Sequence, residues 1–137
     1  FVEEVERASL RIGGANVAAR EDGRGRLRPG VSCAGETQAI NAFLGERDLL
    51  EERSVGYGNS FGVLSQYYGR EAGLELREDI DTVLEPGMVI SMEPMLTIPD
   101  GKTGAGGYRE HDILEITEEG HENITGYPYG PEYNSVG

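Results

Sequence analysis

Glu93 is the residue in this chain whose sequence context most favours a chemical role. In the segment MVISMEP, residues 88–94, the side chains of Val89, Ser91 and Glu93 would share one face of a strand. A carboxylate at the end of an apolar strand, directly before a proline, costs free energy unless it is paired or used. We therefore expect Glu93 to take part in a functional site, where its negative charge could hold a cation.

Glu110 and His111 form a second candidate pair, in the segment GYREHD. Adjacent strand residues point to opposite faces, so without a bulge only one of the two can face a given site. A histidine can exchange protons near neutral pH. The alternative is that His111 is an ordinary structural residue of the strand, and the strand pattern alone leaves this open.

Arg70 and Asn59 are candidates for binding a substrate. Arg70, in YYGREAG, could hold a carboxylate through two parallel hydrogen bonds, although an ion pair with Glu71 or Glu75 on a helix surface would explain it equally well. Asn59, in GYGNSFG, can donate and accept hydrogen bonds. It does not titrate near neutral pH and is a poor ligand for transition metals.

Four other residues that could suggest a site are expected to be ordinary. Asp79 and Asp81, in REDIDTV, have the spacing of a metal-binding pair, but a solvated acidic turn is the simpler interpretation. His121 follows a turn and should be exposed to solvent. Cys33 is the single cysteine, has no histidine near it in sequence, and should have a structural role.

The segments that hold these candidates also resemble a known family. Residues 54–95 and 104–134 closely resemble the C-terminal half of the creatinases, whereas residues 1–50 resemble it weakly. The creatinases are metal-free amidinohydrolases of the pita-bread hydrolase superfamily, the M24 peptidase-like proteins, which also includes methionine and Xaa-Pro aminopeptidases.

The resemblance implies specific roles for the candidate residues. Glu93 would bind the guanidinium group of a small guanidino-acid substrate, and His111 would lie beside that substrate as a catalytic residue, with Glu110 as a supporting carboxylate. In the metal-dependent relatives, the glutamates equivalent to Glu93 and Glu110 bind a divalent metal such as Mn, Co or Zn. The creatinase resemblance itself implies no cofactor.

The substrate pocket would be completed by residues from the same segments that resemble the creatinases. Arg70 would clamp the substrate carboxylate, and Phe61 and Tyr108 would line the pocket with Asn59. Relatives carry a histidine where this chain has Asn59. This difference argues against a metal site and against ordinary creatinase efficiency.

The implied reaction in the complete enzyme is hydrolysis of creatine to sarcosine and urea. The family's proton-shuttling histidine and second glutamate lie in an upstream half of the fold that this chain does not contain. We therefore expect a portion of a longer protein, inactive by itself, that forms a homodimer or pairs with the missing N-terminal half. The alternatives are a Xaa-Pro peptidase-like metallohydrolase and a non-catalytic pita-bread remnant or binding module.

The elements that must position these residues indicate an α+β fold, half or more of a pita-bread domain, with helices packed on a curved antiparallel sheet. We expect one domain over residues 1–137, with a helical part at 1–53 and a sheet part at 54–137. The pattern predicts helices at 3–22 and from an N-cap at Ser32 to about Leu50, separated by a turn at 23–30. It predicts strands at 88–92 and 108–117, a loop at 95–107, and an irregular tail from Gly126.

The overall charge bounds the classes of partner. A net charge of −13 argues against nucleic-acid binding. Lys102 is the only lysine in this acidic chain, which would suit a halophilic protein kept soluble at high salt. We find no apolar run of membrane-spanning length and no signal-peptide pattern, and one cysteine fits a reducing compartment, so we expect a cytoplasmic protein.

Overall fold

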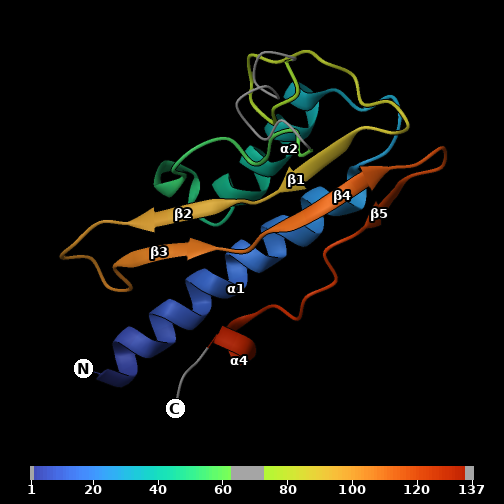
Figure 1. The fold of residues 1–137 in the computed structure, drawn as a ribbon. Coiled ribbons are helices and arrows are strands. Elements are labelled where there is room, and N and C mark those ends of the chain that lie inside the picture. The colour runs from blue at the N-terminus through green and yellow to red at the C-terminus, as the bar shows by residue number, and fades with distance from the viewer. Residues whose placement is uncertain (1, 63–72, 135–137) are drawn as a thin grey trace.

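The structure is a computed structural model that describes residues 2–62 and 73–134. Two long helices lie on one face of an antiparallel ribbon of strands, and a short helix near the C-terminus packs beside the start of the first one (Figure 1). The helices are α1 (Val2–Arg26), α2 (Cys33–Gly45), the 3-10 helix η1 (Leu50–Glu52) and α4 (Pro131–Asn134). No helix in the described part of the chain is both long enough and apolar enough to cross a membrane.

Helix α1 continues beyond the end predicted from its glycines. The turn predicted at residues 23–30 is wrong for its first part, because the helix runs to Arg26. Two ion pairs along the helix hold this last turn: Arg24 Nη2 lies 2.7 Å from Glu21, and Arg26 Nη1 lies 2.6 Å from Asp22.

Gly23 allows α1 to approach the rest of the core. A Cβ atom at this position would lie 2.8 Å from Cδ1 of Ile40 on α2 and 3.0 Å from Cε of Met92. The glycine that appeared to break the helix is therefore the residue that lets helix and sheet pack closely.

Helix α2 begins as predicted and ends earlier. The Ser32 hydroxyl accepts a hydrogen bond from the backbone N–H of Gly35 at 3.0 Å, which confirms the N-cap. The helix ends at Gly45, and Leu50, its predicted end, lies outside it and is 39% exposed. Cys33 is buried at the first position, and burial raises the pKa of its thiol to about 11, as suits a structural residue.

The strands form two sheets that continue one another. Strands β1 (Val89–Met92), β4 (Asp112–Ile116) and β5 (His121–Asn123) form one sheet in the order β1-β4-β5, and β2 (Met95–Ile98) pairs with β3 (Gly106–Arg109). The predicted loop at 95–107 is therefore partly wrong, since it contains β2 and the start of β3. The predicted strand at 108–117 is divided at Glu110 and His111.

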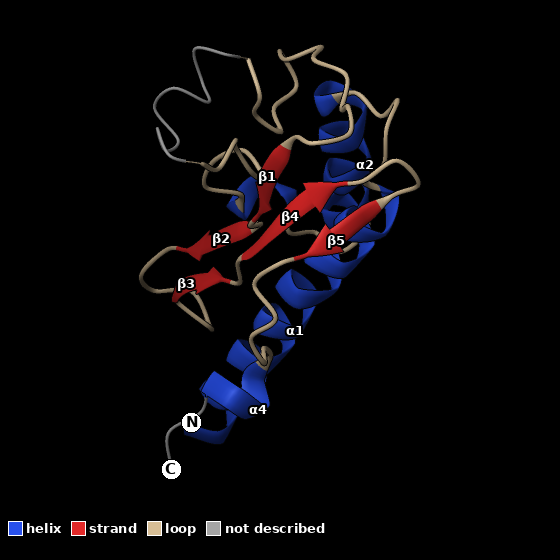
Figure 2. Ribbon diagram, turned by 45° about the vertical axis from the view of Figure 1, so that its right-hand side comes forward, coloured by secondary structure: helices blue, strands red, loops and turns tan. Residues whose placement is uncertain are grey.

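The register is the same on both sides of this interruption. Met92 pairs with Asp112 and Met95 pairs with Arg109, so two residues on each strand lie between the two sheets. The residue opposite Glu93 is therefore His111. The helices cover one face of the ribbon and leave the other free of helices (Figure 2). Side chains alternate along both strands, and Met92 and Asp112 are buried on the helix-covered face, so Glu110 belongs to that face and Glu93 and His111 belong to the other.

The helix-covered face is the core. It is formed mainly by fully buried strand residues: Ile90, Met92, Leu96, Leu114 and Ile116. The core also contains an ion pair that the sequence did not predict. Arg20 Nη1 of α1 lies 2.9 Å from Asp112 of β4, both side chains are at most 2% exposed, and the guanidinium of Arg20 stacks on the ring of Tyr129.

The C-terminal part is more ordered than predicted. The tail, expected to be irregular, ends in α4, which contacts α1. His121, expected to be exposed, is half-buried on β5, and its Nδ1 lies 2.9 Å from the carbonyl oxygen of Leu27.

Candidate active site

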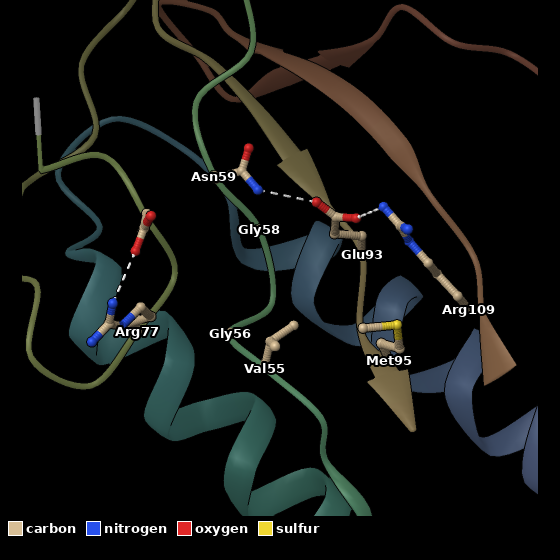
Figure 3. Close-up of a pocket in the computed structure, with 9 residues that line it drawn as sticks. Val55, Gly56, Gly58, Asn59, Arg77, Glu93, Met95 and Arg109 are labelled. Carbon is tan, nitrogen blue, oxygen red and sulfur yellow. Dashed lines mark hydrogen bonds and ion pairs between the residues drawn. The ribbon is translucent and has the colours of Figure 1, made fainter. Parts of the chain in front are cut away.

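The candidate site is centred on the carboxylate of Glu93, which is held from three directions. Its Oε1 accepts hydrogen bonds from the hydroxyl of Ser91 at 2.9 Å and from Nδ2 of Asn59 at 3.2 Å. Its Oε2 forms an ion pair with the guanidinium of Arg109. Figure 3 shows Asn59 and Arg109 approaching the carboxylate from opposite sides. The side chain is only 12% exposed, so these partners largely replace water around its charge.

The segment at residues 57–61 brings Asn59 to this position by running antiparallel along β1. The backbone N–H of Ser91 donates to the carbonyl of Asn59 at 2.8 Å, and that of Glu93 donates to the carbonyl of Tyr57 at 2.7 Å. Gly58 is required for this contact, because a Cβ atom there would lie 1.9 Å from the carbonyl oxygen of Ser91. The second glycine of GYGNSFG, Gly58, thus has a steric explanation.

A polar cluster fixes the other side of this segment to α2. The hydroxyl of Tyr57 donates to Oδ1 of Asn41 at 2.5 Å, and Arg53 donates to the same oxygen at 2.8 Å. Glu78 accepts from Arg53 and Asn41, and these hydrogen bonds lower its pKa to about 2. Burial raises the pKa of Tyr57. The cluster therefore ties the site segment to the helical layer.

Glu93 lies on the wall of an open cavity of about 490 Å³. Its charged lining residues are two carboxylates and two arginines: Glu75, Glu93, Arg77 and Arg109. Arg77 is paired with Glu75 at 3.2 Å and with Asp79 at 2.9 Å, whereas Arg109 is paired with Glu93. The cavity is thus suited to a small ligand that carries charge, with Glu93 as the acceptor for a cationic group.

His111 lies on the same face as Glu93, next to the aromatic ring of Phe61. Its ring meets that of Phe61 edge-on, with the centroids 5.8 Å apart. Its Nε2 atom is buried and has no hydrogen-bond partner in the described part of the structure. A buried ring nitrogen of this kind is costly in a resting protein, and His111 is not among the residues that line the cavity beside Glu93.

Two predicted site residues, Glu110 and Tyr108, are not brought to Glu93. Glu110 lies on the helix-covered face, where its Oε1 accepts a hydrogen bond from the backbone of Gly130 at 3.3 Å. Tyr108 also faces α1, and its hydroxyl donates to the carbonyl of Gly104 at 2.7 Å. Both residues line a second cavity of about 470 Å³ beside α1. Arg70 lies outside the described residues.

A metal site is not formed by the residues that the structure describes. Glu93 and Glu110, the two carboxylates considered as ligands, lie on opposite faces of the ribbon, and the guanidinium of Arg109 already neutralises Glu93. Among residues 2–62 and 73–134, no group of three or more His, Cys, Asp or Glu side chains could hold a metal ion. Asp79 is paired with Arg77, and Asp81 is exposed.

Ser91 and Arg109 are site residues that the sequence reasoning missed. Ser91 was visible as a member of the Glu93 face, but its hydroxyl could not be assigned to the carboxylate from periodicity alone. Arg109 stands two residues before His111, and two residues along a strand is one step on the same face. That spacing was the available signal for Arg109.

Comparison with characterised sequences gives a consistent family. The sequence model of metallopeptidase family M24 matches residues 6–118. Creatinase from Bacillus sp. strain B-0618 is 57% identical over 136 residues, which are 99% of this chain and 33% of the relative. Xaa-Pro aminopeptidase 2 from Streptomyces coelicolor is 30% identical and is matched over 78% of this chain and 27% of its own length.

Comparison with solved structures gives the same fold. Prolidase from Pyrococcus furiosus superposes with a TM-score of 0.75 at 22% identity, over 87% of this chain and 33% of that protein. Xaa-Pro dipeptidase from Bacillus anthracis superposes with a TM-score of 0.72 at 28% identity, over 86% of this chain and 31% of that protein.

These comparisons, with the helices on an antiparallel sheet, confirm the α+β pita-bread fold and the resemblance to creatinase. The chain spans about a third of the length of the relatives it matches. It belongs to metallopeptidase family M24.

Proposed function

We propose that this chain supplies the guanidine-binding part of a creatinase-like amidinohydrolase, which hydrolyses creatine to sarcosine and urea. The observation that carries the proposal is the carboxylate of Glu93, which lies on a cavity wall and already holds a guanidinium, that of Arg109. The 57% identity to a creatinase over nearly the whole chain supports the same substrate class.

Each site residue then has a role that its surroundings support. Glu93 accepts hydrogen bonds from the substrate guanidinium, while Ser91 and Asn59 hold its other oxygen in place. His111 lies on the same face, its buried Nε2 has no hydrogen-bond partner among the described residues, and it is the candidate proton-exchanging group. Arg70 is assigned to the substrate carboxylate by the family resemblance.

Hydrolysis of a guanidinium carbon needs a base that activates water and an acid that protonates the leaving nitrogen. Within the described residues, His111 is the one candidate on the Glu93 face, so we propose that the complete active site also draws on groups outside this chain. The helix-free face and exposed apolar residues near it, Val55 and Phe61, are consistent with a partner half or a second subunit. A strictly monomeric species in gel filtration would contradict this association.

Calorimetric titration of the 137-residue chain with creatine tests the proposal. We expect binding by the wild type and at least about tenfold weaker binding by Glu93→Gln, because a neutral amide loses the charge-assisted hydrogen bonds to the guanidinium. Glu46→Gln, which changes an exposed glutamate just after α2, should bind as the wild type does. Equal affinity of wild type and Glu93→Gln would refute the role of Glu93.

The second candidate is a metal-dependent Xaa-Pro peptidase, which the family match and the 30% identity to an Xaa-Pro aminopeptidase favour. It would require Glu93 and Glu110 to share a divalent ion such as Mn, Co or Zn, and their positions on opposite faces count against it. Titration of the chelator-treated chain with Mn²⁺ distinguishes the two. Binding that depends on both glutamates would support the peptidase. A chain that binds neither creatine nor metal would be a non-catalytic remnant or binding module.

A further inference from the structure

We propose that Arg109 is an internal competitor for the substrate: its guanidinium occupies the place of the substrate guanidinium on Glu93 and must leave before a ligand can bind. This inference rests on the proposed binding of a guanidine ligand by Glu93. In this resting state, the Arg109 side chain occupies the carboxylate oxygen of Glu93 that a ligand would need.

The hydrogen-bond pattern of the carboxylate leaves one oxygen for a cation. Oε1 is committed to Ser91 and Asn59, both of which approach from the segment and strand that form the cavity wall. Oε2 is occupied by Nη2 of Arg109. A ligand guanidinium that approaches Glu93 therefore meets a group of the same chemical type, already in contact with the oxygen it needs.

The two partners differ in how firmly they are held. Glu93 is 12% exposed and fixed by its hydrogen bonds, whereas the side chain of Arg109 is 52% exposed and extends from a surface strand. Half-exposed ion pairs of this kind contribute little, because water and salt compete for the exposed partner. Arg109 can therefore be displaced at small cost, while Glu93 remains in position.

The displaced side chain would not leave an unsupported charge. Arg109 is half-exposed, so water and counterions can solvate its guanidinium once it has left Glu93.

Internal competition lowers the apparent affinity of a ligand by the fraction of molecules in which the site is open. It also favours ligands that match the displaced group, since a planar guanidinium replaces another more completely than an ammonium does. We therefore expect Arg109 to weaken binding in general and to bias the site toward guanidines.

The test uses the 137-residue chain, with NMR of the arginine Nε–Hε groups and calorimetric titration with creatine and with methylguanidine. On addition of either ligand, the Arg109 signal should move to that of a solvent-exposed arginine with the same saturation curve as binding. Arg109→Met should bind creatine about three- to tenfold more tightly than the wild type. Arg109→Lys should lie between them and serves if the methionine variant does not fold.

Arg47→Met is the matched control, because Arg47 is a similarly exposed arginine in the turn after α2 that pairs with Glu46 and stacks on Phe43. It should leave both affinities unchanged. If Arg109→Met binds creatine no more tightly while Glu93→Gln loses binding, the competitor role is wrong and the proposed function stands. If methylguanidine displaces Arg109 but creatine does not bind, the competitor role stands and the substrate assignment falls. If neither ligand moves the Arg109 signal, the inference is wrong.

Discussion

At the scale of single residues, Glu36 is a buried carboxylate outside the candidate site. It lies in the first turn of α2, is 1% exposed, and accepts two hydrogen bonds of 3.1 Å from Arg26. Burial, together with the nearby charge of Asp22, raises its pKa to about 7 despite this partner. A group whose pKa is higher in the folded chain favours folding in its protonated form.

The free energy of unfolding should therefore fall as pH rises. The contribution of Glu36 is complete below its unfolded pKa of 4.5 and is lost as pH rises through about 7, a change of about 3 kcal/mol. Urea denaturation between about pH 5 and pH 8 should show this loss in the wild type and a flatter profile in Glu36→Gln. Glu46→Gln should keep the wild-type slope. Equal slopes in all three proteins would show that Glu36 titrates normally.

The sequence context of Glu93 predicts a partnered carboxylate, and in the structure this carboxylate has three partners. Glu93 was predictable because a charge that ends an apolar strand needs a partner. Its partners, Ser91 and Arg109, depend on register and side-chain rotamer, which periodicity does not determine. The face of His111 could be decided only once the pairing of the two strands was known.

At the scale of elements, one ion pair joins α1 to the centre of the sheet. Arg20 and Asp112 are almost fully buried and 2.9 Å apart. Removal of Asp112 leaves the buried Arg20 guanidinium with the partly exposed Glu21, 2.6 Å away, as its carboxylate partner in the described structure, so Asp112→Ala should lower the free energy of unfolding by about 3 kcal/mol. The double variant Arg20→Met/Asp112→Leu should recover most of this loss, because apolar residues of similar size remove both charges. Denaturation of Arg20→Met, of Asp112→Leu and of the double variant measures the coupling between the two residues.

If the double variant is as unstable as Asp112→Ala, the loss comes from packing rather than from the unpaired charge. Glu52→Ala is a control, because its partner Lys102 is 61% exposed and the pair should contribute little. This comparison separates the buried ion pair from ordinary surface ion pairs.

The elements were predictable where local signals govern them and not where contacts distant in sequence do. The N-cap at Ser32 is a local signal, and it was recognised. The extension of α1 through Gly23 depends on a close contact with Ile40 and Met92. The loop prediction at 95–107 failed because β2 and β3 are strands through pairing with each other.

At the scale of the whole molecule, the net charge of −13 is the dominant property. An increase in salt from about 0.1 M to about 1 M reduces the Debye length from about 10 Å to about 3 Å, which screens repulsion between acidic groups. We expect the midpoint of thermal unfolding to rise with NaCl over this range. A midpoint that stays constant or falls would show that the paired charges, rather than net repulsion, control stability, and would remove the argument for a halophilic protein.

The unbroken register of the β1–β2 and β3–β4 ribbon has an evolutionary consequence. Insertion or deletion of one residue between Met92 and Met95 would turn every later side chain of that strand to the opposite face. The residues opposite Glu93 would change, and Glu110 could replace His111 as its neighbour. Point substitutions can therefore adjust this site gradually, whereas a single-residue length change in the ribbon would convert it to a different set of groups in one step.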